Sequence, residues 1–453
     1  MPSLKISPAL VLNSLANSNV CTNTVRKNKI KIQAKDPNQI LKRWVWIYFF
    51  LLLFEGSLRK WVLPSLAVPL LVVRDPVALF LLLTAWQRDL LPKTPYLYIV
   101  IIIGVISIFT GIFGHANIVV SLYGARILLL HYPLMFIIGR VFTRADIIKM
   151  GKVILFISIF MSILIGLQFY SPQSAWVNRA AGGMEGAGFS GALGYYRPPG
   201  TFSFATGTVL FFGLLAPFVL YFWIHRNNIN FILLILATLS LLAAIPFSIS
   251  RSLFFSVIIS AFFLIISVLQ QPKYIGKVLL AIVAIVIVFA VLSQAGFFGT
   301  STEAFTTRLE GANETEGGLK GVFADRYLGG LIGSLESSSE TPFWGYGIGS
   351  GSTAGLSMLG AEIVRGTTEG EWGKWIYELG PLMGLIIILL RVTLTTKIFI
   401  ASYHKLKVGD FLPWMLTSVG LFLISQGEWS QPTSLGFNVL TGGLIIASLR
   451  KSV

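Results

Sequence analysis

Long apolar runs recur along the chain, each near the length of about 20 residues that a helix needs to cross a bilayer. Short polar segments separate them, so the pattern predicts an all-α, polytopic transmembrane bundle of about 12 spans over residues 44–453, after a flexible tail over residues 1–43. The predicted spans are Trp44–Leu53, Leu66–Trp86, Tyr96–Phe113, Ile118–Ile138, Val153–Tyr170, Phe204–Trp223, Phe231–Phe247, Leu253–Leu269, Val278–Leu292, Trp375–Leu390, Leu412–Ile424 and Leu435–Leu449. Between two of them, residues from about 296 to 374 form a Gly- and Glu-rich stretch, which predicts one large loop outside the membrane.

The positions of Lys and Arg predict the orientation of the bundle. They are concentrated in alternate loops, and loops of this kind face the cytoplasm. This places both termini in the cytoplasm and the large loop outside. Glu55, Arg59 and Lys60 interrupt the first apolar run and indicate a turn near the surface. In this orientation Arg59 and Lys60 fall outside, against the general trend.

Composition narrows the class of protein. Of the 453 residues, 55% are hydrophobic and only 12% are charged, which is about half the charged fraction of a soluble domain. The net charge of +16 comes mostly from the inner loops, so it does not indicate a nucleic-acid partner. The single cysteine, Cys21, excludes an intrachain disulfide, and the four scattered histidines do not predict a zinc site. We therefore expect no metal and no cofactor.

Arginines from separate outer segments form a candidate anion site. Arg197 ends a Gly-rich loop, Arg251 lies in a Ser-rich hairpin between two spans, and Arg308 and Arg326 lie in the large loop. Arginine keeps its charge at any working pH, and its planar fork grips phosphate oxygens. Several arginines converging at one membrane face would suit a pyrophosphate. The alternative is that each is an interfacial anchor or an isolated surface charge.

Carboxylates at the end of the large loop are candidates for a general base. Glu369 and Glu371 precede the next span, and either side chain could take the proton of an acceptor hydroxyl if it lay near the arginines. Glu371, Lys374 and Glu378 would share one face of a helix. A Glu371–Lys374 ion pair is therefore the structural alternative.

Charged residues within the predicted spans need partners, because charge at membrane depth is costly. Arg74, Asp75 and Arg126 are expected to neutralise one another, with Asp75 pairing with Arg126 as one arrangement. Trp372 and Trp375 are expected to form part of an aromatic belt at the membrane interface.

The glycines at alternate positions from Gly345 to Gly351 have the spacing of a phosphate-binding loop. No clear strand precedes them, and no Gly-Lys-Ser/Thr follows, so a nucleotide site there is only weakly indicated.

Several of these segments together resemble the bacterial O-antigen ligase and O-antigen polymerase superfamily. The resemblance covers roughly residues 40–450, and the order of the motifs carries more weight than any one motif. The matching features are Arg197-Pro198-Pro199-Gly200-Thr201-Phe202 opening a span, the Ser250-Arg251-Ser252 hairpin, Arg326 followed by Trp344-Gly345-Tyr346-Gly347-Ile348-Gly349, and Glu378-Leu379-Gly380 with Gly384.

The resemblance implies a multi-pass, metal-independent glycosyltransferase of the bacterial plasma membrane. Its donor would be a glycan on undecaprenyl pyrophosphate, held by Arg197, Arg251 and Arg326, and its acceptor a glycan or glycolipid of the cell surface. Ligases of this family typically carry a histidine near the end of the large loop. Here Glu369 or Glu371 occupies that region, so a polymerase, or a ligase using another acceptor, is equally compatible.

Two other classes of protein remain open. A transporter or flippase for lipid-linked glycans would carry charged residues along a central pathway and two related halves, and the sequence shows few charges within its spans and no evident inverted repeat. The third class is a non-catalytic membrane assembly subunit. Replacing the outer arginines by lysine discriminates these classes, because a bidentate phosphate site should suffer and an interfacial anchor should not.

Overall fold

Many of the helices begin and end close to the limits of the apolar runs, although α15 extends well beyond its run, to Lys407. The computed structural model describes residues 36–450 except 187, 227–228, 278, 281–282, 284–286, 288–295, 316–332, 334–340 and 361–369. The helices are α1 (Gln39–Ser57), α2 (Asp75–Gln87), α3 (Pro95–His115), α4 (Ile118–Arg126), α5 (Tyr132–Val141), α6 (Arg144–Tyr170), α7 (Ala205–Ile224), α8 (Phe231–Ser248), α9 (Arg251–Gln270), α11 (Gly296–Thr315), α14 (Thr353–Leu359), α15 (Glu371–Lys407), α16 (Phe411–Gln426) and α17 (Pro432–Leu449). Short 3₁₀ or π turns are η2 (Leu58–Val62), η3 (Pro64–Leu66), η4 (Pro69–Val72), η5 (Ile127–His131), η6 (Trp176–Asn178) and η8 (Pro272–Tyr274).

Within the described residues, nine helical stretches are long and apolar enough to cross a membrane, and Phe411–Gln426 is a shorter apolar helix. The prediction of a helical, polytopic membrane protein is therefore confirmed. Most of the predicted span at Val278–Leu292 and most of the tail over residues 1–43 lie outside the described residues. Helix α1 begins at Gln39, slightly before the predicted start at Trp44.

Helix starts are fixed by side chains that accept backbone N–H bonds. Thr143 and Asp146 form a reciprocal capping box at the start of α6, and Asn117 caps α4. Ser250 caps α9, so Arg251 is the first residue of that helix. The Ser-rich turn before α9 therefore has a local structural reason, and it sets where the Arg251 side chain begins.

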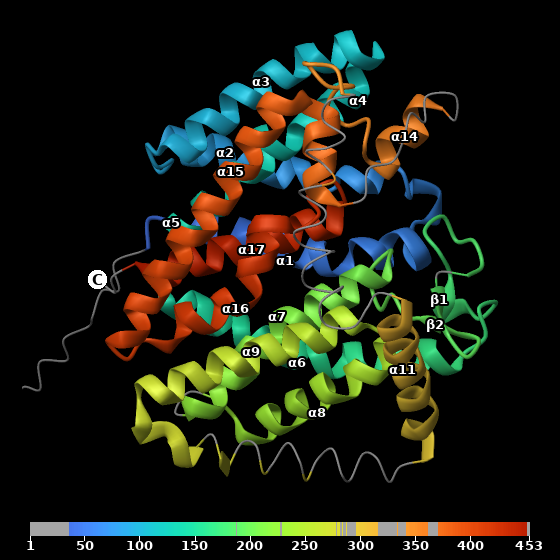
Figure 1. Cartoon of the computed structure of the whole chain (residues 1–453), viewed down its shortest axis with the longest axis vertical. Helices are drawn as coiled ribbons and strands as arrows, with labels where there is room; N and C mark the ends of the chain where they lie inside the picture. Colours follow the sequence, from blue (N-terminus) through green and yellow to red (C-terminus); the bar gives the residue numbers. More distant parts are fainter. Residues whose placement is uncertain are drawn as a thin grey trace, which may run out of the picture. The chain divides into compact units, whose positions relative to one another are not determined.

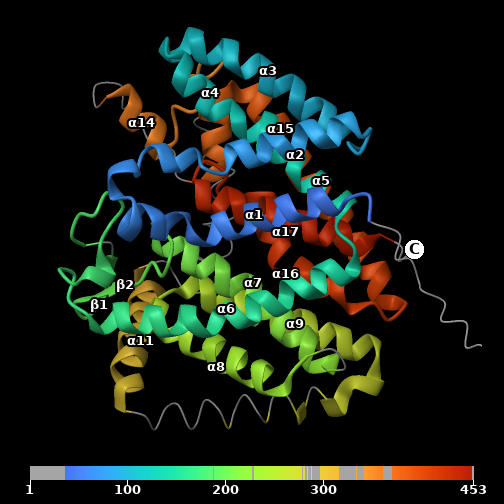
Figure 2. The ribbon, with the colours of Figure 1, turned by 180° about the vertical axis from the view of Figure 1, so that it is seen from behind.

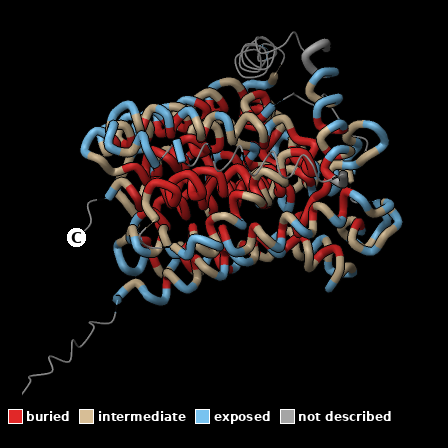
Figure 3. Tube along the Cα trace, turned by 90° about the horizontal axis from the view of Figure 1, so that it is seen from below, coloured by how far each residue is buried: buried red, intermediate tan, exposed pale blue. Residues whose placement is uncertain are grey.

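Helices α7 and α17 occupy the interior of the bundle. They are 94% and 78% buried within the protein, whereas α9, which is more apolar than either, is 28% buried. Figures 1 and 2 show α17 surrounded by other helices, and Figure 3 shows the buried backbone gathered in the middle. Glycines allow this close packing: a Cβ on Gly442 would lie 2.2 Å from the Met135 sulfur, and one on Gly443 would lie 2.6 Å from Ile138 Cβ.

A short antiparallel hairpin departs from the all-helical prediction. Strands β1 (Phe189–Ala192) and β2 (Tyr195–Arg197) form the end of the segment predicted as a Gly-rich loop, with Phe189 paired with Arg197. Tyr195 stacks on Phe169, close to the end of α6, at a ring-centroid distance of 4.6 Å. The hairpin is thereby held at one end of the bundle, and Arg197 is part of a strand rather than of an irregular loop.

One prediction about local environment is correct only in part, and another is wrong. The first helix does end in a turn, η2, at the predicted place, but Glu55, Arg59 and Lys60 are buried at 3%, 8% and 0% exposure. Trp375 is predicted in an interfacial belt, but it is 3% exposed and packs inside the protein. Arg59 and Lys60 bond residues that lie far away in the sequence, Ser203 and Gly200.

Candidate functional site

The predicted arginines are distributed over three elements at the hairpin end of the bundle. Arg197 ends β2, Arg251 begins α9, and Arg308 lies on α11; all three side chains are half-buried. Figure 1 shows β1, β2 and α11 side by side at this end. Arg326 lies outside the described residues.

Arg308 joins α11 to the hairpin. Its guanidinium donates to the carbonyl oxygen of Gly191 at 2.7 Å and to that of Ser190 at 3.4 Å, both on the strand that pairs with β2. Gly191 in turn packs against the side chain of Ile249, two residues before Arg251. Burial, and then the positive charge of Arg251, lower the pKa of Arg308. The repulsion between Arg251 and the half-buried Arg308 would be relieved by an anion bound near them.

The loop that follows Arg197 is held by the C-terminal end of α1, the turn η2 after it, and α6. The buried Lys60 Nζ donates to the Gly200 carbonyl oxygen at 2.6 Å, and Gln168 bonds both the N–H and the carbonyl of Gly200. The Thr201 hydroxyl donates to the Leu53 carbonyl at 2.6 Å. A Cβ on Gly56 would lie 2.5 Å from the loop backbone, so only glycine permits this approach. These contacts restrict the position from which Arg197 projects.

The glycine-rich loop at 345–351 binds a carboxylate of the protein itself. The N–H of Gly351 donates to Glu378 Oε1 at 2.8 Å, and the N–H of Gly347 donates to the Glu378 carbonyl at 3.1 Å. Gly345, Gly347 and Gly349 all have positive φ, which suits glycine. Because Glu378 accepts from the loop, these donors do not support the phosphate-binding interpretation of the glycine spacing.

Glu371 lies in a buried ion pair with Arg391, not with Lys374. Its Oε1 is 3.3 Å from the Arg391 guanidinium and accepts from the N–H of Trp429 at 3.0 Å. The Glu371 side chain is 2% exposed. Glu369, the other candidate base, lies outside the described residues.

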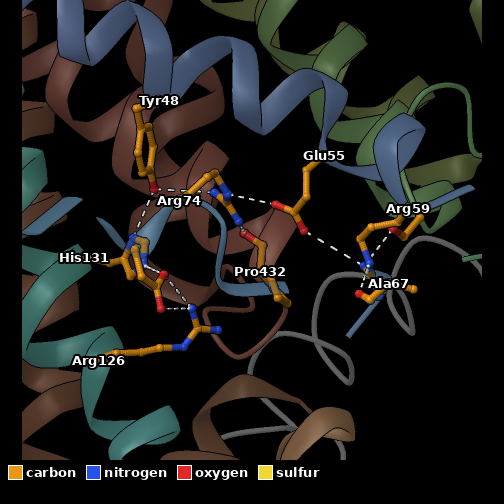
Figure 4. A network of polar contacts seen from close by, with 10 residues as sticks. Tyr48, Glu55, Arg59, Ala67, Arg74, Arg126, His131 and Pro432 are labelled. Carbon is orange, nitrogen blue, oxygen red and sulfur yellow. Dashed lines mark hydrogen bonds and ion pairs between the residues drawn. The ribbon is translucent and has the colours of Figure 1, made fainter. Parts of the chain in front are cut away.

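A second group of charged side chains lies among the helices near the N-terminal half of the chain (Figure 4). Asp75 accepts from Arg126 at 2.8 and 3.0 Å, which confirms the predicted Asp75–Arg126 pair. The buried His131 bonds Asp75 through Nε2 at 2.9 Å and the Tyr48 hydroxyl through Nδ1 at 3.1 Å. Asp75 thus has two partners rather than one.

The same network continues toward the loop after Arg197. Arg74, which is 2% exposed, donates to Glu55 at 3.0 Å, to the Tyr48 hydroxyl at 3.4 Å and to the Pro432 carbonyl oxygen. Arg59 lies 4.0 Å from Glu55 and donates to the Ser203 hydroxyl at 2.9 Å.

The buried charges do not cancel. Three arginines (Arg59, Arg74 and Arg126) face two carboxylates (Glu55 and Asp75), so the network carries a net charge of 3 − 2 = +1 when His131 is neutral. In the sequence, Glu55 is the residue that indicates this network, because an acid within an apolar run requires a basic partner. Tyr48 and His131 carried no comparable signal.

No group of His, Cys, Asp and Glu within the described ranges has the geometry to hold a metal ion. No protein-family model matches the chain, and no curated protein matches it. The observations that bear on function are therefore those of the arginines, the carboxylates and the buried network.

Proposed function

We propose that this chain is a membrane glycosyltransferase that transfers or polymerises a glycan from undecaprenyl pyrophosphate onto an acceptor sugar of a surface polysaccharide such as O-antigen, capsule or exopolysaccharide. The proposal includes a multi-pass protein of the bacterial plasma membrane, with about 12 spans, both termini in the cytoplasm and the large loop outside. What supports it is that Arg308 bonds the strand that pairs with the one ending in Arg197, and that burial, and then the charge of Arg251 from a third segment, lower the pKa of Arg308.

The arginines would supply the main contribution to catalysis. A sugar pyrophosphate is a good leaving group, so its departure needs stabilisation of negative charge more than protonation. Half-buried guanidinium groups held by backbone contacts are preorganised for that task. Arg308 is held by two carbonyls of β1, and the loop after Arg197 is held by Lys60 and Gln168. Arg326 is proposed as a fourth donor to the pyrophosphate.

The acceptor hydroxyl needs a base. Glu369 is the first candidate, since Glu371 is occupied by Arg391 and by the N–H of Trp429. A Glu371 base would have to leave that ion pair or act through Oε2, which makes no hydrogen bond within the described part of the chain. Glu369→Gln and Glu371→Gln, compared at matched protein levels in membranes, distinguish the two. Wild-type donor consumption in both variants would remove both residues from the role.

The test of the arginine site is replacement by lysine, which keeps the charge and removes the planar fork. We expect Arg197→Lys, Arg251→Lys and Arg308→Lys each to slow transfer from a lipid-linked donor by about tenfold, since one charge-assisted hydrogen bond contributes about 1.5 kcal/mol. Arg179→Lys is the matched control, because Arg179 is exposed on the segment that leads to the hairpin. Unchanged transfer in all three site variants would refute the proposed pyrophosphate site.

The second candidate function is a transporter or flippase of lipid-linked glycans. The observation that favours it is the buried network of Figure 4, because intramembrane charges commonly mark transport or proton pathways. Asp75→Asn should abolish movement of a fluorescent lipid-linked glycan across proteoliposomes if the protein transports it. Transfer of the glycan to an acceptor without such movement would favour the glycosyltransferase.

A further inference from the structure

A cavity of about 320 Å³ lies at the end of the bundle where α6 begins and α7 ends. Arg144, His225 and Lys277 line it together with the rings of Tyr221 and Tyr274. Its volume falls at the lower end of the range of small-molecule sites, about 300–1,000 Å³. Cations and aromatic rings are therefore gathered around a space large enough for a small polar group.

This cavity is separate from the arginine site. Helix α6 runs from Arg144, which lines the cavity, to Tyr170, which follows the residue that stacks on the hairpin. A helix of 27 residues is about 40 Å long, which exceeds the hydrocarbon thickness of about 30 Å. The two sites thus lie toward opposite faces of the membrane, and the cavity lies on the face predicted to be cytoplasmic.

The charges that face the cavity leave a positive excess. Arg144 pairs with Asp410 at 2.7 Å, and Lys277 Nζ donates to the Ile224 carbonyl at 3.1 Å and pairs with no carboxylate of the described residues. The balance is 2 − 1 = +1 with His225 neutral. An anion is the ligand that this arrangement favours.

His225 has a donor or acceptor position to spare. Its ring stacks on Tyr221 at a centroid distance of 4.7 Å, and its Nδ1 is buried and makes no hydrogen bond within the described residues. Buried polar atoms in folded proteins almost always have a partner. Burial lowers the pKa of His225, the Tyr221 backbone beside the ring partly offsets this, and the charges of Arg144 and Lys277 lower the pKa further. A bound anion would supply the missing partner and oppose that shift.

We propose that this cavity binds a phosphate group, supplied by the headgroup of an anionic glycerophospholipid of the facing leaflet. Lys277 and Arg144 contact the phosphate oxygens, and His225 bonds it through Nδ1. The apolar side chains of Ile148 and Phe222, which also line the cavity, face the glycerol and upper acyl chains.

The apolar wall distinguishes the lipid from a free phosphate. Basic pockets between helices at the cytoplasmic face are a known setting for anionic headgroups, and each Lys or Arg near such a surface contributes about 1 kcal/mol. Inorganic phosphate has no apolar part and would make no apolar contact with Ile148 and Phe222. The cavity also differs from a merely basic surface, because Lys273 lies on the same segment but does not line it.

The test uses the full chain, purified in detergent and loaded with defined lipids, with retained lipid measured by native mass spectrometry. We expect phosphatidylglycerol to be retained in preference to phosphatidylcholine. Lys277→Gln should weaken this retention about fivefold, the equivalent of about 1 kcal/mol. His225→Phe keeps the ring that stacks on Tyr221 and should also weaken it. Lys273→Gln, the matched control with the same loss of charge, should retain phosphatidylglycerol as the wild type does.

Equal retention of the two lipids, or equal losses in Lys277→Gln and Lys273→Gln, would overturn the proposal. Displacement of phosphatidylglycerol by millimolar inorganic phosphate, but not by chloride at equal ionic strength, would support a phosphate pocket and overturn the lipid as its source. His225→Phe leaves all formal charges in place at neutral pH. If this variant retains less phosphatidylglycerol, the result supports the site even when Lys277→Gln folds poorly. None of these readouts depends on glycosyl transfer.

Discussion

The Glu371–Arg391 pair gives the sharpest stability prediction. Glu371→Gln removes the negative charge but keeps the shape of the side chain. The amide oxygen of the glutamine can therefore still accept the hydrogen bond from the N–H of Trp429. Arg391 then loses its only carboxylate contact in the described part of the chain. It keeps the carbonyls of Ile424 at 2.9 Å and Gly427 at 2.7 Å and lies 4.8 Å from the ring of Trp429.

The expected loss follows from burial. Both side chains are 2% exposed, so Arg391 becomes an uncompensated charge that water cannot solvate. Removing one partner of a buried pair costs about 3–5 kcal/mol. The two remaining carbonyls favour the lower end of that range, about 3 kcal/mol. Arg391→Met should cost a similar amount, but the double variant should lose much less than the sum, since no unpaired charge is left.

Thermal unfolding of the purified chain in one detergent, followed by tryptophan fluorescence, measures these differences as shifts in midpoint. Glu428→Gln is the matched control, because Glu428 is exposed and undergoes the same chemical change. We expect a clear decrease for Glu371→Gln and none for Glu428→Gln. A wild-type midpoint in Glu371→Gln together with lost transfer would refute the structural reasoning and favour Glu371 as the base. Additive losses in the double variant would also contradict it.

Further variants test other parts of the fold. Asp75→Asn leaves Arg126 without its carboxylate and should lower the free energy of unfolding by about 2–3 kcal/mol, measured in the same assay. Gly380→Ala should cost about 3 kcal/mol, since φ is +80° and a Cβ would lie 2.0 Å from a backbone oxygen; Gly409→Ala, with φ of +86° and open space, should cost only about 1 kcal/mol. Burial lowers the pKa of Lys60 from 10.5 to about 7. The unfolded chain therefore binds the extra proton between those values, so stability should rise with pH from about 7 to 10, and Lys60→Met should abolish that rise.

Apolar length was enough to predict most of the helices. The span predicted at Ile118–Ile138 corresponds to the continuous stretch Ile118–Val141, and the one at Phe231–Phe247 corresponds to α8. The cost of charge at membrane depth also predicted the Asp75–Arg126 pair as one of two arrangements, although Arg74 pairs with Glu55. Both inferences depend on one dominant energy, the transfer of groups out of water, which composition reports directly.

Partner choice could not be predicted where several partners were chemically equivalent. Glu371 had Lys374 one turn away, but it pairs with Arg391, 20 residues along. The reason is the break at Gly380, with φ of +80°, which divides α15 and lets its two parts lie against each other. A Cβ on Gly384 would lie 2.7 Å from the Ile376 Cα, so the two parts approach at glycine. The spacing of residues along one ideal helix therefore could not predict that the two parts of α15 lie against each other.

The buried network and the proposed donor site are both bonded to η2, the turn that follows α1. Arg59 lies near Glu55 of the network and bonds Ser203, while the adjacent Lys60 bonds Gly200 in the loop that follows Arg197. A change in the charge of the network can therefore displace the loop without touching the donor. If that coupling operates, Asp75→Asn should reduce transfer by weakening donor binding, in step with Lys60→Met. A transport pathway through the network would instead make only Asp75→Asn defective, because the hydrogen bonds that join Asp75, His131 and Tyr48 do not include Lys60, which bonds Gly200.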